Sequence, residues 1–493
     1  MMPETSVPTA RRRMDRFIEF LLHFIGLSVI FMIVNHQEDK IMRHRWLITN
    51  LIPVLLLGLM SGCGKPRGGF SVPVHYHKLD NGLKVVLSPD HTSPLVVVAV
   101  YYNIGFRIEP KNRTGFAHLF EHMMFQGSRN LGKMEFIRLI QKNGGVLNGS
   151  TRFDFTNYYE IVPQHKLETV LWAEADRMRG LDITKENLDN QKGVVVNEIN
   201  EALHNQPYGG FPWLDMPQMA NSNWYNAHNF YGIVDDVKAA KIEEVRNFFR
   251  TYYAPDNAVL VVTGDFQPSE ALNLIKKYFA DIPKTQRPAL PDLSEPRQEK
   301  EKVFSKDDRL ATQPALAFAY HMPPVNTPEY YAMGLLDQIL LQGEDSKLHQ
   351  ALVKRKGLTS GVSGGINADL GDMFDYNGPM LWSASLFHDN NVSSKTIMAV
   401  ADSVIESVRS KPVDQKTLDR ALVKFRSGLY GSIDSFLANL LASFALFEDN
   451  PSKINTLEQR FKEVTPEEIL RTAKEYLRPS NRTVLTIRPK AKP

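Results

Sequence analysis

Apolar and polar residues follow one another along this chain in patterns typical of both strands and helices. Residues 76–87 alternate in polarity around Asn81-Gly82, and an Asn-Gly pair between alternating runs predicts a β-hairpin. Residues 95–102 form a continuous run of β-branched, apolar and aromatic side chains. Such a run predicts a strand buried on both faces, near the centre of a sheet.

Helix signals lie between these strands. Residues 115–126 precede Gly127 and predict a helix that ends there, and Thr184 can cap a second helix that runs to about Leu203. Residues 465–468, Thr-Pro-Glu-Glu, form a capping box with proline at the first helical position. Because strands and helices alternate without a strict βαβ rhythm, we expect an α+β fold.

The pattern occurs twice. Residues 243–263 match residues 467–487 at a constant offset of 224, and residues 120–127 match 336–343 at an offset of 216. Between the copies, residues 284–302 hold three prolines and many charges with no apolar period, which is typical of a linker. We therefore predict two related mixed α/β lobes, at 73–283 and 303–493, joined by that linker.

The first 64 residues differ from the rest. Two apolar runs, 17–34 and 47–60, each follow basic residues, as in targeting segments. The second run follows Met42-Arg-His-Arg and ends in Met-Ser-Gly before Cys63. This order resembles a bacterial lipoprotein signal peptide over residues 42–63, and the resemblance implies cleavage before Cys63 and acylation of that cysteine.

The residues on either side of the predicted signal peptide bear on a possible extra anchor and on the membrane that the protein would reach. Residues 1–41 are either an upstream extension or an extra anchor, and residues 64–72 are a tether. Gly64-Lys65 lacks the aspartate that retains such lipoproteins in the inner membrane of Gram-negative bacteria. The resemblance therefore favours an outer-membrane lipid anchor, with the protein facing the periplasm.

Composition narrows the chemistry. The chain has 493 residues, with 58 Lys plus Arg against 55 Asp plus Glu, which gives a net charge of +3. Because this charge is small and evenly spread, it argues against nucleic acid as a partner. The single cysteine excludes a disulfide framework and any cysteine-based metal site. A metal would need histidine and carboxylate ligands, and the chain has 14 histidines.

Residues 118–122 read His-Leu-Phe-Glu-His, an H-x-x-E-H pentapeptide on a predicted helix. Positions four apart lie on one helical face, so His118 and His122 can reach one zinc ion and Glu121 stands beside them. The alternative is a helix with two exposed polar histidines. The surrounding apolar residues, Phe116, Leu119, Phe120, Met123 and Met124, argue against it, because a half-buried histidine pair needs a partner.

Three motifs together carry a family resemblance: H-x-x-E-H, Asn148-Gly149-Ser150-Thr151, and the segment 194–198 that ends in Glu198. In this order they resemble the pitrilysin/insulinase family of zinc peptidases, which includes the mitochondrial processing peptidase. The family's third zinc ligand is a glutamate at about the spacing of Glu198, which follows His122 by 76 residues. The resemblance implies one zinc ion per chain, with Glu121 as general base on the zinc-bound water.

Two further roles follow from the resemblance. Gln191 stands where many members have another glutamate, and we expect it to hydrogen-bond near the metal and to tune the site. Residues 148–151 stand where the family lays an extended substrate along an edge strand; a plain internal strand is the alternative. The aromatic loop 204–231 lines a substrate chamber or packs in the core, and its two histidines are expected to be structural.

The second copy lacks this chemistry. Gly334, Asp337 and Gln338 occupy the positions of His118, Glu121 and His122, so the second lobe has no such zinc site. The family's substrate clamp, an arginine and a tyrosine, is replaced by Val353 and Ser360. The resemblance therefore implies the metal-binding half of a two-chain clamshell whose partner, a second two-lobed chain, supplies the clamp.

The sequence thus predicts a zinc-dependent endopeptidase that cleaves unfolded peptides or protein segments. Two rivals remain: a non-catalytic lipoprotein subunit that uses the lobes only for binding or assembly, and a chaperone-like, zinc-dependent peptide-binding protein of the periplasm.

Overall fold

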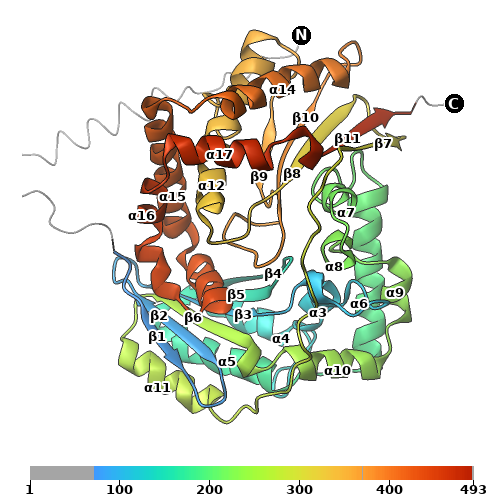
Figure 1. Cartoon of the computed structure of the whole chain (residues 1–493). Coiled ribbons are helices and arrows are strands. Elements are labelled where there is room, and N and C mark those ends of the chain that lie inside the picture. Colours follow the sequence, from blue (N-terminus) through green and yellow to red (C-terminus); the bar gives the residue numbers. More distant parts are fainter. Residues whose placement is uncertain (1–70, 369, 491–493) are drawn as a thin grey trace, which may run out of the picture. The chain divides into compact units, whose positions relative to one another are not determined.

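The computed structural model describes residues 71–368 and 370–490. The predicted signal peptide, with Cys63 and the segment before it, lies outside these residues. The described chain contains two sheets, each covered by helices (Figure 1). This mixed architecture confirms the predicted α+β class.

The first sheet has six strands in the order β1-β2-β6-β3-β5-β4. Their bounds are β1 His75–Lys78, β2 Lys84–Pro89, β3 Leu95–Tyr102, β4 Val146–Thr151, β5 Thr156–Pro163 and β6 Ala258–Gly264. The predicted hairpin is present, because β1 pairs antiparallel with β2 and Tyr76 lies opposite Val86. β3 has the predicted bounds and lies between β5 and β6, whereas β4 is the outer strand.

Nine α-helices lie between β3 and β7 along the described chain: α3 Phe116–Met123, α4 Glu135–Lys142, α5 Leu167–Arg179, α6 Lys185–Ile199, α7 Asp215–Ala220, α8 Trp224–Ala227, α9 Val234–Ala239, α10 Ile242–Tyr252 and α11 Pro268–Phe279. Of these, α7 packs against β7, β8 and β11 of the second sheet. Thr184 caps α6 as predicted, since its hydroxyl accepts from the Asn187 amide at 3.1 Å. The helical path continues through η4, Asn200–His204. The helix predicted over residues 115–126 ends earlier, at Met123, because the chain turns more tightly beyond that residue.

The second sheet has five strands in the order β7-β11-β8-β10-β9. Their bounds are β7 Lys302–Asp308, β8 Ala315–His321, β9 Ser363–Ile366, β10 Leu381–Phe387 and β11 Arg482–Pro489. Its helices are α12 Pro328–Leu340, α13 Lys347–His349, η6 Gln350–Arg355, α14 Ser394–Ser410, α15 Gln415–Glu448, α16 Leu457–Lys462 and α17 Pro466–Tyr476. The predicted capping box at Thr465 is present at the start of α17.

The two sheets share one topology. If β1 is set aside, the orders β2-β6-β3-β5-β4 and β7-β11-β8-β10-β9 correspond strand by strand. In each sheet the first pair is parallel and the other pairs are antiparallel. This agreement is the structural counterpart of the repeat in the sequence.

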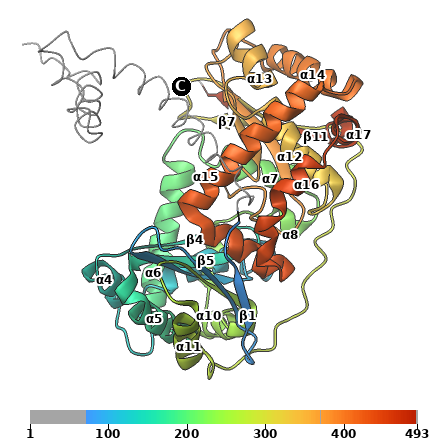
Figure 2. The same ribbon diagram turned by 90° about the vertical axis from the view of Figure 1, so that its left-hand side faces the viewer.

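The helix α15 joins the lobes. It bends at Phe436, which has non-helical backbone angles, and its second half crosses the first sheet (Figures 1 and 2). The Lys84 ammonium on β2 donates to the Ala445 carbonyl at 2.9 Å and to the Leu446 carbonyl at 3.1 Å. Within the described residues no single helix is long and apolar enough to cross a membrane, and only the two bent parts of α15 taken together, Gln415–Ile433 and Phe436–Glu448, pass such a test.

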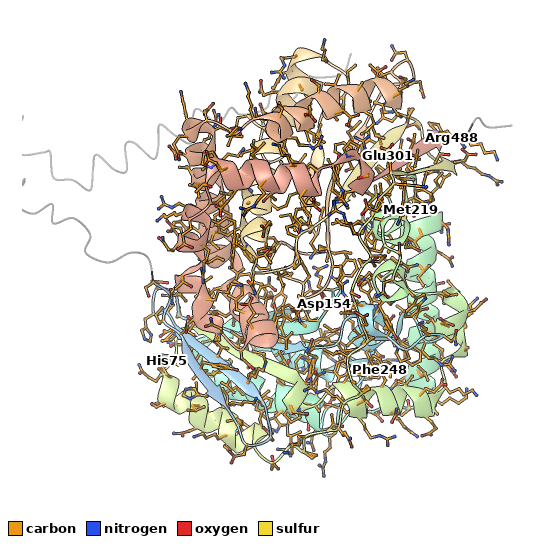
Figure 3. The ribbon with its side chains drawn as sticks, in the orientation of Figure 1. His75, Asp154, Met219, Phe248, Glu301 and Arg488 are labelled. Carbon is orange, nitrogen blue, oxygen red and sulfur yellow. The ribbon has the colours of Figure 1, made fainter. Side chains whose placement is uncertain are left out.

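Buried polar contacts also connect the lobes close to β4. Asp154 lies in the turn between β4 and β5 and is labelled in Figure 3. Arg107 is fully buried, and its Nε donates to Asp154 at 2.7 Å. The same guanidinium donates to the Pro379 carbonyl of the second lobe at 3.1 Å, and the Asn377 amide donates to Asp154 at 2.7 Å. The position of this turn therefore depends on both lobes.

A second polar connection contains the buried carboxyl group of Asp375, and the half-buried Asp372 lies beside it. Asp375 accepts from the Asn439 amide at 2.8 Å, and Asn439 in turn accepts from the Tyr101 hydroxyl of the first sheet at 2.9 Å. Burial, followed by the charge of Asp375, raises the pKa of Asp372 to about 8. Asp372 is therefore protonated in the folded chain at neutral pH.

Replacing Asp372 with asparagine should stabilise the chain by an amount that grows as pH rises from about 4 to about 8. An unfolded aspartate has a pKa of about 3.9, so between about pH 4 and pH 8 the folded wild type holds a proton that the unfolded chain releases. Wild-type stability therefore falls as pH rises through this window. Urea unfolding should show Asp372→Asn gaining about 1 kcal/mol or more at pH 8.5 and little at pH 4.5. An equal change at both pH values would contradict this assignment.

Candidate metal centre

The start of α3 is fixed by a buried carboxylate. Glu109 accepts from the Gly115 amide at 2.9 Å and from the Ala117 amide at 2.6 Å, so it satisfies two of the free N–H groups at the helix start. His228 lies 3.6 Å from the same carboxylate. Burial lowers the pKa of His228, but the hydrogen bond and charge of Glu109 outweigh it and the pKa is raised. The sequence prediction of a structural role for His228 agrees with this contact.

The structure brings His118, His122 and Glu198 together. His118 and His122 lie one turn apart on α3, and their Nε2 atoms are 3.2 Å apart. Glu198, near the end of α6, places Oε1 3.5 Å from the His118 Nε2 and Oε2 3.3 Å from the His122 Nε2. The three groups offer ligand atoms that all lie within 4.8 Å of one another.

These separations fit a zinc ion. With zinc–ligand bonds of about 2.0–2.1 Å, two ligand atoms of a tetrahedral site lie roughly 3.3 Å apart. Three protein ligands leave a fourth position open, as catalytic zinc sites require. Two imidazoles and one carboxylate are also a donor set that zinc accepts.

Matches to family models and to known proteins agree with this geometry. Residues 84–211 match the model described as insulinase (peptidase family M16), and residues 239–424 match the model of the peptidase M16 inactive domain. The chain belongs to peptidase family M16. The first match contains all three candidate ligands, and the M16 inactive-domain match covers most of the second lobe, where they are missing.

Curated relatives of this M16 chain include zinc proteases. It is 25% identical over 431 residues to the zinc protease PqqE of Helicobacter pylori, across 83% of this chain and 92% of that protein. It is 24% identical over 232 residues to the beta subunit of the mitochondrial-processing peptidase of Bos taurus, across 47% of each. The probable zinc protease PqqL of Haemophilus influenzae is 27% identical over 317 residues, 62% of this chain and 34% of PqqL.

Solved structures show the same M16 fold. A protease from Helicobacter pylori superposes with a TM-score of 0.78 and 23% identity, across 85% of this chain and all of that one. The periplasmic protease PqqL of Escherichia coli superposes with a TM-score of 0.69 and 18% identity, across 86% of this chain and 48% of that one. The M16 chain described here therefore spans about half the length of PqqL.

In the M16 site, the ionisation states of His118 and Glu198 favour metal binding. Burial lowers the pKa of His118 to about 4, against the opposing charge of Glu198, so this imidazole is neutral at pH 7 and its lone pair is available. Burial raises the pKa of Glu198, but the hydrogen bond from His122 and the charges of both histidines outweigh it, and the net shift is downward. Glu198 is therefore ionised.

Glu121 is held by the end of strand β4. The Thr151 hydroxyl donates to the Glu121 carboxylate at 2.8 Å, and Thr151 itself is buried. Burial raises the pKa of Glu121, and the hydrogen bond from Thr151 is the largest opposing effect. The positive charge of Arg152, a residue that no sequence motif indicated, also lowers this pKa.

Aromatic side chains from the loop before α9 cover one side of His118. The Phe230 ring lies 4.4 Å and the Tyr231 ring 5.3 Å from the His118 ring, measured between centroids. This approach requires glycine at two positions, since a Cβ on Gly115 would lie 2.6 Å from the Tyr231 carbonyl and one on Gly232 would lie 2.3 Å from the Gly115 amide. The sequence analysis left the role of these aromatic residues open, and the structure places two of them at the site.

Gln191 lies on α6 two turns before Glu198, on the same face of the helix. It is buried and hydrogen-bonds to His122, one of the contacts that favour the protonated form of that ring. On the other ligand, the Nδ1 atom of His118 is buried and has no hydrogen-bond partner among the described residues.

The other predicted positions lie apart from the ligands. Asn148, Gly149 and Ser150 lie on the outer strand β4, with Asn148 exposed, and the strand edge away from β5 is unpaired within the described residues. In the second lobe, Asp337 is buried and accepts from the Trp382 indole at 2.7 Å. Gly334 packs against Met373, where a Cβ would lie 3.0 Å from the nearest atom of that side chain.

Proposed function

We propose that this chain is a zinc-dependent endopeptidase, with His118, His122 and Glu198 as the ligands of one zinc ion. The observation that carries the proposal is the convergence of these groups at tetrahedral separations beside a half-buried carboxyl group, Glu121. Zinc supplies a Lewis acid that polarises a peptide carbonyl and lowers the pKa of water.

Glu121 is proposed as the general base. The base must take a proton from the attacking water and later return a proton to the leaving amine. Burial raises the pKa of Glu121, which brings it closer to the neutral range where a base of this kind works best. The hydrogen bond from Thr151 fixes one carboxylate oxygen, so the other is free to face the water.

The proposed substrate is an extended polypeptide. The free edge of β4 presents backbone N–H and C=O groups, which pair with any extended chain and largely independently of its sequence. Thr151, at the end of this strand, contacts the proposed base, so a peptide laid along Asn148–Ser150 is led toward the metal ligands. Folded proteins cannot add a strand in this way, so the account favours peptides and unfolded segments.

We further propose that the active enzyme contains a second two-lobed chain. Val353 and Ser360 replace the clamp residues expected from the family resemblance, and this chain spans about half of PqqL. The mitochondrial-processing peptidase relative is itself named as a subunit. Two such chains would form the halves of a clamshell.

We also propose that a lipid anchor at Cys63 holds the protein at the outer membrane, facing the periplasm. The signal-peptide pattern supports the anchor, and the name of PqqL as a periplasmic protease supports the compartment.

The rival proposal is a non-catalytic or chaperone-like peptide-binding subunit. A zinc-dependent chain that only binds peptides would need the three metal ligands but not a base beside them, and in this chain Glu121 lies beside the ligands. The match to an M16 inactive domain covers residues 239–424, which exclude the four groups.

The partner is tested by titration. Turnover of an unstructured peptide by the isolated chain should be weak or absent, because the clamp that holds the scissile carbonyl is missing. Adding a two-lobed chain that lacks H-x-x-E-H but retains the arginine and tyrosine should raise turnover by about 10²-fold or more. Full zinc-dependent turnover by a verified monomer or homodimer, with no effect of the partner, would refute the two-chain model.

A further inference from the structure

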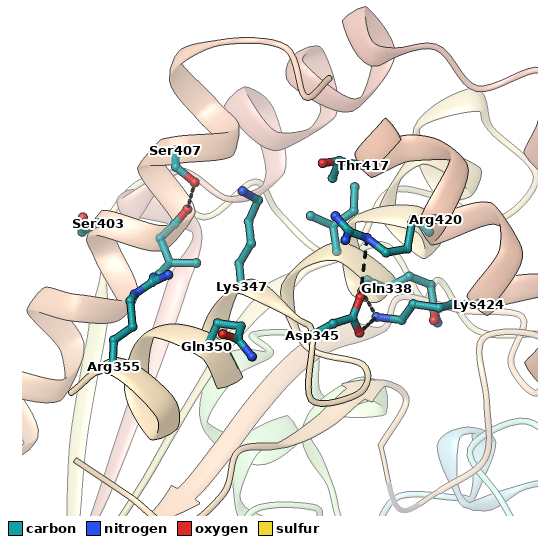
Figure 4. A pocket seen from close by; sticks show the side chains of 13 residues that line it. Gln338, Asp345, Lys347, Gln350, Arg355, Ser403, Ser407, Thr417, Arg420 and Lys424 are labelled. Atoms are coloured by element: carbon teal, nitrogen blue, oxygen red, sulfur yellow. Dashed lines mark hydrogen bonds and ion pairs between the residues drawn. The ribbon is translucent and has the colours of Figure 1, made fainter. Parts of the chain in front are cut away.

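A polar cavity lies in the second lobe, the one without metal ligands. It has a volume of about 440 Å³ and is bounded by the end of α12, the segment α13–η6, helix α14 and the start of α15 (Figure 4). None of its lining residues belongs to the metal centre or contacts it. The residues that line it include Gln338, Asp345, Lys347, Gln350, Arg355, Ser403, Arg420 and Lys424.

The cavity carries an excess of positive charge. Lys347, Arg355, Arg420 and Lys424 line it, and Asp345 is the single acidic residue among its lining residues. Lys424 lies 2.8 Å from the Asp345 carboxylate and Arg420 lies 3.6 Å from it. The Asp345 carboxylate thus forms ion pairs with two of the four cations. Lys424 also donates to the carbonyl of Gln338.

The other two cations are not neutralised. Within residues 71–368 and 370–490, the side chains of Lys347 and Arg355 have no hydrogen-bond or ion-pair partner, and Figure 4 shows Lys347 extending between Arg355 and Arg420. The neighbouring Lys354, by contrast, does not line the cavity and pairs with Glu344 at 3.1 Å.

Asp414, an acid outside the cavity lining that interacts with Lys347 and Arg420, already has a hydrogen-bond partner. Asp414 caps α15 by accepting from the Thr417 amide at 2.7 Å, and its pKa is lowered chiefly by that contact and to a smaller extent by the charges of Lys347 and Arg420. Lys347 and Arg355 therefore give the cavity a positive field that no ion pair in the described residues neutralises. Such a field in a concave site raises the local concentration of anions.

We propose that this cavity binds a small multivalent phosphate. The planar guanidinium groups of Arg355 and Arg420 can each form paired hydrogen bonds with phosphate oxygens, and Lys347 adds a charge between them. The Ser403 hydroxyl on α14 lies at the same cavity wall and can donate to a bound oxygen. The negative charges of two linked phosphate groups balance the excess positive charge of the cavity better than the single charge of one carboxylate does.

Inorganic pyrophosphate is the probe, and titration calorimetry on the purified full chain is the measurement. The wild type should bind one equivalent, and Lys347→Ala/Arg355→Ala should weaken binding by about tenfold or more, since two charge-assisted contacts are lost. Lys354→Ala removes an adjacent cation that does not line the cavity and should bind like wild type. Glu198→Gln should also bind like wild type, which separates this site from pyrophosphate held by zinc.

Citrate distinguishes phosphate from carboxylate chemistry. It should bind more weakly than pyrophosphate at the same ionic strength, because its carboxylates do not offer three oxygens on one centre. The proposal is overturned by absent saturation, by equal affinity of the double variant and the wild type, by loss of binding in Glu198→Gln, or by tighter binding of citrate. Thermal unfolding of each variant confirms that the chains compared are folded.

Discussion

Replacing Glu121 with glutamine should lower peptide cleavage by at least ~10²-fold while zinc remains bound at one ion per chain. Glutamine has nearly the same shape as glutamate and can still accept the hydrogen bond that the Thr151 hydroxyl donates at 2.8 Å. It cannot take a proton from water, so only the chemical step is lost. Turnover of an unstructured peptide, measured with the partner chain present, and zinc content by elemental analysis are the two readouts.

The matched control for this prediction is Thr151→Val, which keeps the shape of the side chain and removes the hydroxyl. It should reduce turnover less than Glu121→Gln does, because the base is still present but is held less firmly. Wild-type cleavage by Glu121→Gln would show that another residue activates the water. Loss of zinc in that variant would show that Glu121 is a ligand instead.

Glu198→Gln, unlike Glu121→Gln, should lose the zinc ion itself. The Glu198 carboxylate lies 3.3 Å and 3.5 Å from the two imidazoles and carries the negative charge of the ligand set. A neutral amide is a poor zinc ligand, so zinc affinity should fall by about 100-fold or more. His118→Ala should have a comparable effect, and activity should disappear in both variants.

Glu121→Gln and Glu198→Gln are the same chemical change at two positions in one site. The account requires that the first keeps zinc and the second loses it. Unchanged zinc content in both Glu198→Gln and His118→Ala would mean that the metal is bound elsewhere.

Local patterns predicted the secondary structure close to the site well. Leu95–Tyr102 was predicted as a central strand because the run is apolar on both faces, and the structure has β3 at these bounds. The H-x-x-E-H spacing placed two histidines on one helical face because helical periodicity is local. The end of α3 was less accurate, since the tight turn after Met123 depends on contacts that the local pattern does not contain.

Contacts between distant positions could not be predicted in the same way. Glu198 was assigned only through the family resemblance, because nothing in the segment around it indicates that α6 packs against α3. Glu109, which holds the start of α3, and Phe230, which lies against His118, carried no motif at all. The glycine pair that brings Tyr231 to the site is visible only when the backbones of Gly115 and Gly232 are seen in contact.

The position of zinc itself is the most direct test of the central claim. A crystal of the zinc-loaded chain, with data collected on both sides of the zinc absorption edge, gives the metal position without reference to activity or to a partner. The account predicts one anomalous peak per chain, about 2.0–2.2 Å from the His118 and His122 Nε2 atoms and from a Glu198 oxygen. A peak away from these three residues, or none at full zinc loading, would contradict it.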